Sequence, residues 1–268
     1  MMPTEGVRLQ REALALSLVA VAAVAVAVPP IAQWPEYHHF ADRRDWLGLP
    51  NFADVVSNLF FTLVGLAGLL WLGRRPAGVF QDARERWPWV VFFGGLTLLG
   101  PASAYYHLAP DDRGLMLDRL TMAATFMGWL SIHLAERLDV RLALRLMPVL
   151  LVLGMGSVLY WYASELAGRG DLRAWGYVQF WPVLLVAWLA WRRPARYTGS
   201  SAVAVVYACY ALALLVEWLD RPIFEATGLL SGHTLKHLIA AAGAAWALYW
   251  LVTRRPVNPA PPCLHVGQ

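Results

Sequence analysis

The chain has 268 residues, of which 59% are hydrophobic and 15% are charged, whereas soluble domains contain roughly 45–50% apolar and about 25% charged residues. This composition excludes an ordinary soluble domain. The formal charge of +4 does not indicate binding to nucleic acid, because the basic residues are spread along the chain and stand at the ends of apolar segments.

The apolar residues form blocks of roughly 20, the length that an α-helix needs to cross about 30 Å of hydrocarbon. Helices are expected because lipid cannot satisfy a bare backbone, and the short alternating segments of a membrane barrel are absent. The sequence therefore predicts an all-α, polytopic membrane helix bundle. In chain order, the predicted spans are 12–32, 53–73, 88–107, 115–135, 142–163, 175–192, 202–220 and 231–253.

The first span follows Arg8 and Arg11 and resembles a signal peptide, but no clean small-x-small cleavage site follows it. We therefore expect an uncleaved signal anchor. It forms, with the N-terminal tail, an additional segment at 1–36. The other seven spans form a core domain at 37–253, and a Pro-rich tail at 254–268 is expected to be disordered and cytoplasmic.

Basic residues stand mainly at alternate ends of the predicted spans. Fourteen lie on one side of the membrane and six on the other, which places both termini in the cytoplasm by the positive-inside rule. Arginine is used almost to the exclusion of lysine and alanine is abundant. These features favour a bacterial inner-membrane protein.

Polar residues inside the spans gather at one depth, near the outer face. A charge at the centre of a span costs roughly 2.5–3.5 kcal/mol on insertion scales, so such residues are functional candidates. Five spans contribute them: Asp54, Ser57 and Asn58; Ser103 and His107; Asp118; Glu217 and Asp220; and His233, Lys236 and His237. We expect a functional site near the outer leaflet.

Three histidines in this group have the spacing of a metal site. His233 and His237 are four residues apart and project from one helical face, and His107 ends another span. A catalytic zinc commonly has three protein ligands and one open position. Membrane histidines often only bond a neighbouring helix, but the convergence of polar groups at one depth favours metal binding.

Three motifs in this order resemble the alkaline ceramidase family. They are the segment PNFADVVSN at 50–58, SAYYH at 103–107 followed by Asp118, and GHTLKH at 232–237. More distantly, the pattern is similar to the wider group of seven-helix membrane hydrolases that includes the adiponectin receptors. The resemblance covers roughly 37–253, so the first span would be an addition to a seven-helix core.

The resemblance implies Zn²⁺ held by His107, His233 and His237, with Ser103 and Asp118 as catalytic residues. It also implies second-shell or substrate-binding roles for Ser57, Asn58, Asp220 and Lys236. The family has a calcium site before its first core helix, and the residues in that region here are Asp42, Asp45, Trp46 and Asn51. The chain departs from the family at Arg119, where an acidic residue is usual, and at Lys236, where Trp is usual. These departures leave the substrate's identity open.

The activity implied is cleavage of the amide bond of a ceramide-like N-acyl lipid to a fatty acid and a free amine, a sphingoid base. Two alternatives remain. A transporter could use the same polar residues, although the inner halves of the spans show no continuing polar path. A receptor-like protein could bind metal and lipid without turnover. The sequence leaves the oligomeric state open.

Overall fold

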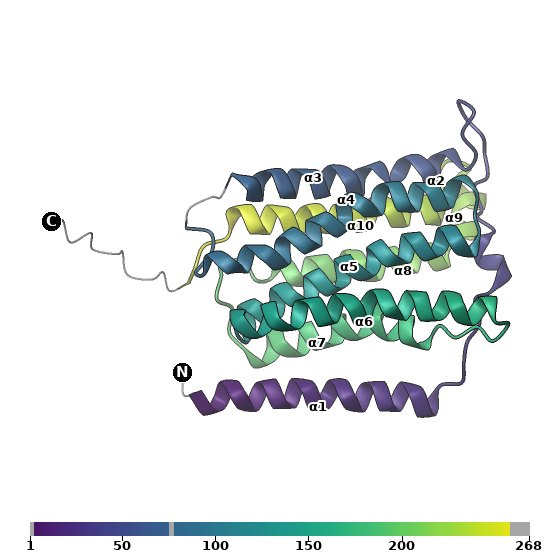
Figure 1. Cartoon of the computed structure of the whole chain (residues 1–268). Coiled ribbons are helices and arrows are strands. Elements are labelled where there is room, and N and C mark those ends of the chain that lie inside the picture. Colours follow the sequence, from purple (N-terminus) through teal and green to yellow (C-terminus); the bar gives the residue numbers. More distant parts are fainter. Residues whose placement is uncertain (1–2, 75–77, 258–268) are drawn as a thin grey trace.

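The computed structural model describes residues 3–74 and 78–257, and this part of the chain contains helices and no β-strand. The long helices lie side by side, as Figure 1 shows, and the predicted all-α bundle is confirmed. The helices are α1 (Pro3–Ala27), α2 (Phe52–Ser57), α3 (Leu59–Gly73), α4 (Arg86–Leu108), α5 (Asp112–Arg137), α6 (Val140–Leu166), α7 (Arg173–Arg192), α8 (Ala202–Trp218), α9 (Asp220–Thr227) and α10 (Gly232–Thr253), with 3-10 turns at Pro35–His38 and Ala83–Glu85.

Five segments of the described chain are helices long and apolar enough to cross a membrane: α1, α2 with α3, α6, α7 and α10. The pair α8 and α9 gives a sixth crossing if this pair, bent by 75°, is one span. The two remaining predicted spans correspond to α4 and α5, which have 23 and 26 residues and are not among these candidate crossings; α5 is the less apolar of the two. The first turn of α1 and the last turn of α10 lie at the same end of the bundle (Figure 1).

The lower apolarity of α5 follows from its central position. Every residue from Met127 to Arg137 is buried, so this half of the helix is surrounded by protein on all sides. A helix enclosed in this way does not need a lipid-facing apolar surface. It can therefore carry polar groups that a peripheral span could not.

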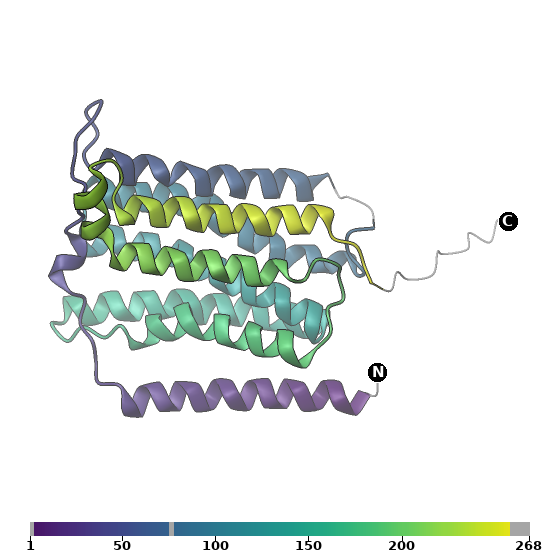
Figure 2. The same ribbon diagram turned by 180° about the vertical axis from the view of Figure 1, so that it is seen from behind.

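Helix α1 lies at the edge of the bundle, beside α7, as Figures 1 and 2 show. Only 11% of an 18-residue apolar stretch of this helix is buried against the rest of the protein. Its contacts with α7 include hydrogen bonds from the Tyr177 hydroxyl to the Ser17 carbonyl oxygen, 3.2 Å, and from Trp181 Nε1 to Ser17 Oγ, 3.1 Å. Helix α1 is therefore the least buried of the five candidate crossings, and its status as an addition to a separate core stays a prediction.

Side chains at the starts of three helices fix where those helices begin. Asp111 accepts a hydrogen bond from Gly114 N at 2.6 Å, Asp139 from Leu142 N at 2.8 Å, and Ser231 from Thr234 N at 3.0 Å. These N-caps satisfy backbone donors that would otherwise lack partners. The cap at Ser231 sets the directions of the side chains in the first turns of α10.

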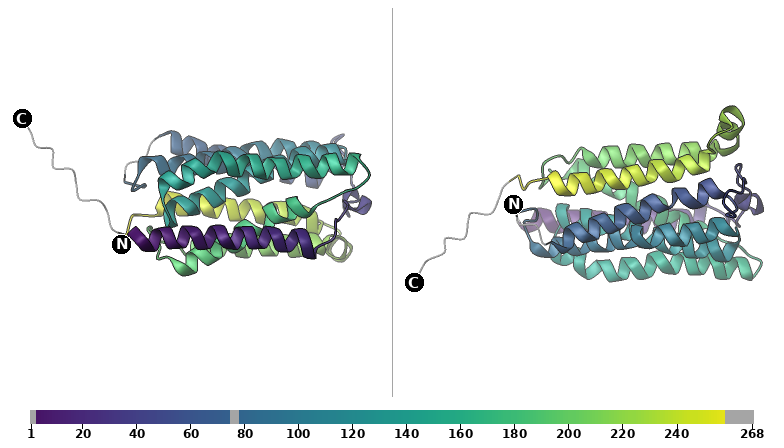
Figure 3. Two further views of the ribbon diagram at one scale, coloured as in Figure 1. Left: turned by 60° about the horizontal axis from the view of Figure 1, so that its bottom comes forward. Right: turned by 90° about the horizontal axis from the view of Figure 1, so that it is seen from above.

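Two predicted spans are broken near the same end of the bundle. The span at 53–73 divides at Asn58 into α2 and α3, and the span at 202–220 ends at Trp218. After Leu219, α9 turns across the end of α8, as the right panel of Figure 3 shows. The breaks bring α2 and α9 together with the start of α10.

The chain stays ordered beyond the predicted boundary of the C-terminal tail. Arg254 is 1% exposed and pairs with Glu136, and Val257 N donates a hydrogen bond to the Arg196 carbonyl oxygen at 2.9 Å. Arg254 also lies over the rings of Tyr197 and Trp250. The rest of the predicted disordered tail, including Cys263 and His265, lies outside the described residues.

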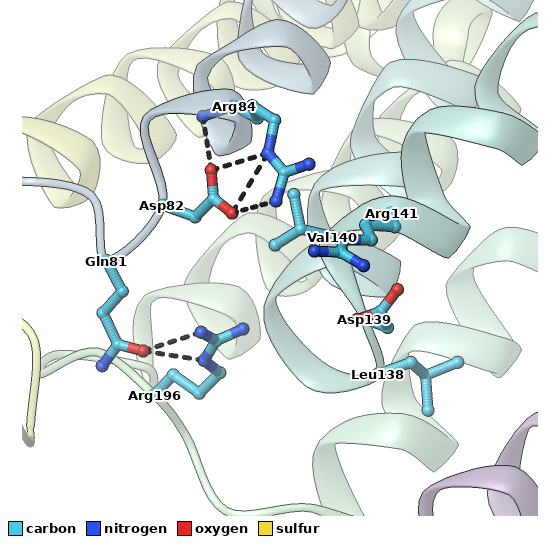
Figure 4. A pocket seen from close by; sticks show the side chains of 8 residues that line it. All are labelled: Gln81, Asp82, Arg84, Leu138, Asp139, Val140, Arg141 and Arg196. Carbon is cyan, nitrogen blue, oxygen red and sulfur yellow. Dashed lines mark hydrogen bonds and ion pairs between the residues drawn. The ribbon is translucent and has the colours of Figure 1, made fainter.

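The sequence places the polar residues of the spans at one depth, but the structure buries ionisable residues at the other end of the bundle as well. A second group of buried ionisable residues lies at the end opposite α2 and α9; it consists of Glu85, His133, Glu136, Arg137 and Arg254. Nearby, a pocket of about 420 Å³ is lined by Gln81, Asp82, Arg84, Leu138, Asp139, Val140, Arg141 and Arg196 (Figure 4). Several of its charged groups already have partners, such as Arg84 with Asp82 at 2.6 Å.

Glycines let α3 and α4 approach closely, as small residues do at helix contacts in membranes. A methyl group at Gly65 would lie 2.5 Å from Thr97 N, and one at Gly100 would lie 2.8 Å from the Asn58 carbonyl oxygen and closer still to Thr62 Oγ1. Gly94, on the same helix as Gly100, has no such neighbour within 4 Å.

Replacing Gly100 with Ala should therefore destabilise the bundle by about 1–3 kcal/mol, the usual effect of overpacking. Gly94→Ala is the matched control and should leave stability unchanged or raise it, because alanine is the better helix former. Thermal unfolding in detergent, followed by circular dichroism, measures both. Equal melting temperatures for the two variants would contradict the packing of α3 on α4 described above.

Candidate metal centre

Three histidine side chains meet at the end of the bundle that holds α2 and α9. His107 comes from the last turn of α4, and His233 and His237 come from the first two turns of α10. They are 1%, 5% and 3% exposed, and one nitrogen of each lies within 4.8 Å of the others. Nitrogens around a tetrahedral zinc stand about 3.4 Å apart, given Zn–N distances of about 2.0–2.1 Å. Small side-chain rotations would close the site.

This group is the only set of three or more His, Cys, Asp or Glu residues placed for metal binding within 3–74 and 78–257. The sequence predicted that these three imidazoles meet, and the structure brings them together. They can hold a metal ion.

Ser57 fixes the orientation and tautomer of His237. The Ser57 hydroxyl donates a hydrogen bond to the Asp54 carbonyl oxygen at 3.0 Å and lies 2.8 Å from His237 Nδ1. Because the hydroxyl proton is used toward Asp54, Nδ1 of His237 must carry the proton and donate. Its Nε2 then keeps a lone pair, which is the form that coordinates a metal.

The other two histidines have buried nitrogens without partners. Among the described residues, His107 Nδ1 and His233 Nε2 have no hydrogen-bond partner. A buried polar atom in that state is unfavourable by about 1–3 kcal/mol. A metal ion at the centre of the three rings would satisfy both atoms, so the residues present fit a metal.

Polar contacts hold the start of α10 against its neighbours. Asp54 accepts a hydrogen bond from Thr234 Oγ1 at 2.5 Å, and Asp220 Oδ1 accepts one from His233 N at 2.7 Å. Gly232 fits because a side chain there would collide with the backbone of Asp220 and Val216. Asp54 and Asp220 thus position the histidines through the helix that carries them.

Asn58, predicted to orient ligands or bind a headgroup, is fully buried at the break between α2 and α3. Its Nδ2 donates to the Asp54 carbonyl oxygen at 2.7 Å, the same oxygen that accepts from Ser57. Asn58 therefore stabilises the turn that places Ser57 against His237.

Ser103 and Asp118 lie together beside the histidines. Ser103 is one turn before His107 on α4, and its hydroxyl is within hydrogen-bonding reach of the Asp118 carboxylate on α5. Both side chains are buried, and Asp118 Oδ1 has no hydrogen-bond partner in the described part of the chain. A buried carboxylate with a free oxygen can take up a proton.

Lys236 forms an ion pair with Glu217 across the α8–α10 contact, with Nζ 2.5 Å from Oε1. The same carboxylate oxygen lies 3.9 Å from His233 Nδ1 and accepts a 3.4 Å hydrogen bond from the Tyr37 hydroxyl. The sequence pointed to both Lys236 and Glu217 as polar residues at this depth, but it did not single out Tyr37.

A segment of the linker between α1 and α2 covers the histidines, and the sequence analysis missed it. The ring of Phe40 lies 4.5 Å from that of His107 and 4.7 Å from that of His233, measured between centroids, and Phe40 is 4% exposed. His38 contacts the Tyr106 hydroxyl at 3.0 Å and Asp112 at 3.1 Å. Only the aromatic run YHHF in a loop could have drawn attention to this cover.

The residues considered for calcium make other contacts. Asp42 receives two hydrogen bonds from the Arg44 guanidinium, at 2.8 and 2.7 Å, and the Asn51 amide donates to the His107 carbonyl oxygen at 2.8 Å. Burial raises the pKa of Asp42, but the bonds from Arg44 outweigh this effect, so its pKa is below the usual value. Asp45 and Trp46 are exposed.

Comparison with known proteins adds no family assignment. No protein-family model matches the sequence, and no curated protein matches it. The resemblance to the ceramidases therefore rests on the motifs alone.

Proposed function

We propose that this protein is a zinc-dependent intramembrane hydrolase that cleaves the amide bond of a membrane lipid. The observation that carries the proposal is the three-histidine cluster with a free buried carboxylate, Asp118, beside it. Three neutral nitrogen ligands that leave a fourth position open are typical of catalytic zinc sites, whereas structural zinc sites are closed by four protein ligands.

When bound to three histidines, Zn²⁺ supplies a hydrolytic nucleophile near neutral pH and can polarise a carbonyl group. The chain's own residues provide the remaining chemistry. The free oxygen of Asp118 accepts a proton from the attacking water and gives it to the nitrogen of the leaving amine as the C–N bond breaks. The Ser103 hydroxyl bonds to Asp118 before the reaction and turns to donate to the carbonyl oxygen as charge develops there.

Phe40 excludes bulk water from this chemistry. Its ring packs on two of the three histidines and is itself buried. Ser57 and the pair Glu217–Lys236 hold the ligand side chains in place. Such supporting contacts commonly change metal affinity by about 10- to 100-fold.

A lipid substrate accounts for the position of the site. The histidines lie beside α3, whose Phe61 ring is 6.2 Å from that of His237, measured between centroids, and this helix carries large exposed apolar residues at Leu59, Phe60, Leu63 and Leu66. An acyl chain can remain in that apolar environment while its amide reaches the site. With both termini in the cytoplasm, the site would lie near the outer leaflet of the membrane.

The second buried polar group, around Glu136 and Arg254, weakens the sequence argument against a transporter. Apolar residues nevertheless separate the two polar groups. Along α5, Ala123 and Met127 are buried between Asp118 and the second polar group, and the buried hydroxyls of Thr125 and Ser131 donate to carbonyl oxygens of their own helix. Along α10, Ala241 and Ala244 are buried after His237. The geometry supports a hydrolase better than a polar path across the bundle.

Purified protein should contain close to one zinc per chain, and His237→Ala should lose most of it. His39→Ala is the matched control, because this histidine is exposed in the same region and belongs to no metal group. Ser57→Ala should weaken zinc binding by about 10- to 100-fold. Metal analysis after chelation and titration with zinc measures all three, and a wild-type protein that binds no zinc would overturn the proposal.

The zinc-loaded protein should release free fatty acid from an N-acyl lipid such as an N-acyl sphingoid base. Asp118→Asn should keep its zinc and lower kcat by about 10²- to 10⁴-fold, since it removes the proton acceptor. Ser103→Ala should also keep zinc and lower kcat by about 10²- to 10³-fold. Zinc binding without release of fatty acid from any N-acyl lipid would favour a receptor-like binding protein instead.

A further inference from the structure

Arg119 is a buried cation with an unused hydrogen-bond donor. It is 5% exposed, and in the described ranges no carboxylate oxygen forms an ion pair with it within 4.0 Å. Its Nη1 atom is buried and has no hydrogen-bond partner among the residues placed by the structure. Buried arginines are normally paired, because an unpaired charge in the membrane region is strongly unfavourable.

Aromatic rings surround the guanidinium, but they leave its Nη1 group without a hydrogen-bond acceptor among the described residues. Its carbon lies 4.3 Å from the ring centroid of Trp161, 5.5 Å from that of Tyr37 and 5.6 Å from that of Trp175. Ring faces stabilise the charge, but the N–H groups point in the plane of the guanidinium and need acceptors. Gln33 Oε1 supplies only one, at 2.8 Å from Nη2.

Arg119 is close to the site of the proposed reaction. It follows Asp118 on α5, so its side chain points about 100° around the helix, toward α6 and α7. Tyr37 connects the two regions: its ring contacts Arg119, and its hydroxyl bonds to Glu217, which lies beside His233. A group bound at Arg119 would therefore lie in the region of the metal site, on the side of Tyr37 away from Glu217.

The other cation near the metal is already engaged. Lys236 is paired with Glu217, so Arg119 is the cation here that has a free donor. Guanidinium N–H groups bind carboxylate and phosphate in preference to neutral oxygens. A neutral hydroxyl-bearing headgroup would leave the charge of Arg119 uncompensated, whereas an anionic one would neutralise it.

We infer that the lipid amide cleaved by this protein carries an anionic group, a carboxylate or a phosphate, on its amine part, and that Arg119 is the residue that selects it. This inference rests on the proposed hydrolase function. It names a substrate class that differs from neutral ceramide-like lipids and makes Arg119 a specificity-determining residue.

Hydrolysis of matched lipids tests the selection. The probes are N-oleoyl-γ-aminobutyrate, N-oleoylethanolamine phosphate and neutral N-oleoylethanolamine, each in detergent with the zinc-loaded protein. The wild type should have a kcat/KM at least about 10-fold higher for one or both anionic lipids, and the two anionic probes distinguish carboxylate from phosphate. Arg119→Gln should lower kcat/KM for the anionic lipids by about 10- to 100-fold, the range expected for a hydrogen bond to a charged group. It should leave kcat/KM for the neutral lipid unchanged.

Gln33→Ala is the matched control for a structural role. It removes the hydrogen bond that Arg119 gives to the linker but leaves the cation in place, so it should retain the preference for anionic lipids. Arg119→Lys should retain part of it. Equal kcat/KM for neutral and anionic lipids in the wild type, or an equal loss for both in Arg119→Gln, would overturn the inference.

Binding separates this inference from the hydrolase proposal. Ketone isosteres, in which a methylene replaces the amide N–H of N-oleoyl-γ-aminobutyrate or of its neutral carboxamide, bind without being cleaved. Quenching of tryptophan emission, to which Trp161 and Trp175 contribute, reports their affinity. If no lipid is hydrolysed, the hydrolase proposal fails. Arg119 still selects anions in that case if the acid isostere binds about 10-fold more tightly than the carboxamide isostere and Arg119→Gln removes the difference. Equal binding of the two isosteres overturns the role of Arg119.

Discussion

The close approach of three buried imidazoles is the constraint on which the rest of this structure depends. A polar atom enclosed in a bundle needs a partner, and His107 Nδ1 and His233 Nε2 find none among the described residues around them. The surrounding helices are arranged so that the rings nevertheless stay together. Ser231 caps α10, Asp220 binds the backbone of His233, and Ser57 fixes the ring of His237. Each contact restricts the orientation of a histidine ring or of the helix that carries it.

The sequence predicted those features that depend on local pattern. Blocks of apolar residues indicated the spans because lipid imposes a minimum length on a helix, and the spacing of His233 and His237 placed both rings on one face. The position of His107 against them followed only from its depth and from the motif resemblance. The lower apolarity of α5 is consistent with the same physics: α5 is enclosed by other helices, so the hydropathy of lipid-facing spans is not required of it.

Features that depend on contacts between distant segments could not be predicted. The pair Glu136–Arg254 joins residues more than a hundred positions apart, and Arg254 stood in the sequence as an ordinary basic residue at the end of a span. The cover formed by Phe40 lies in a loop without a periodic pattern. The sequence indicated that Asp220 supports the metal site. The structure shows that Asp220 accepts a hydrogen bond from a backbone nitrogen, and no residue pattern reveals such a contact.

The cover over the histidines and the least buried helix belong to one continuous stretch of chain. From Val28 to Phe40 this stretch is held by a few contacts, including Gln33 N to Glu165 at 2.6 Å and Leu172 N to Ile31 O at 2.8 Å. Helix α1 has little of its apolar surface buried against the rest of the protein. Because a single linker joins this helix to Phe40, the position of α1 and the position of the aromatic ring over the histidines are physically connected.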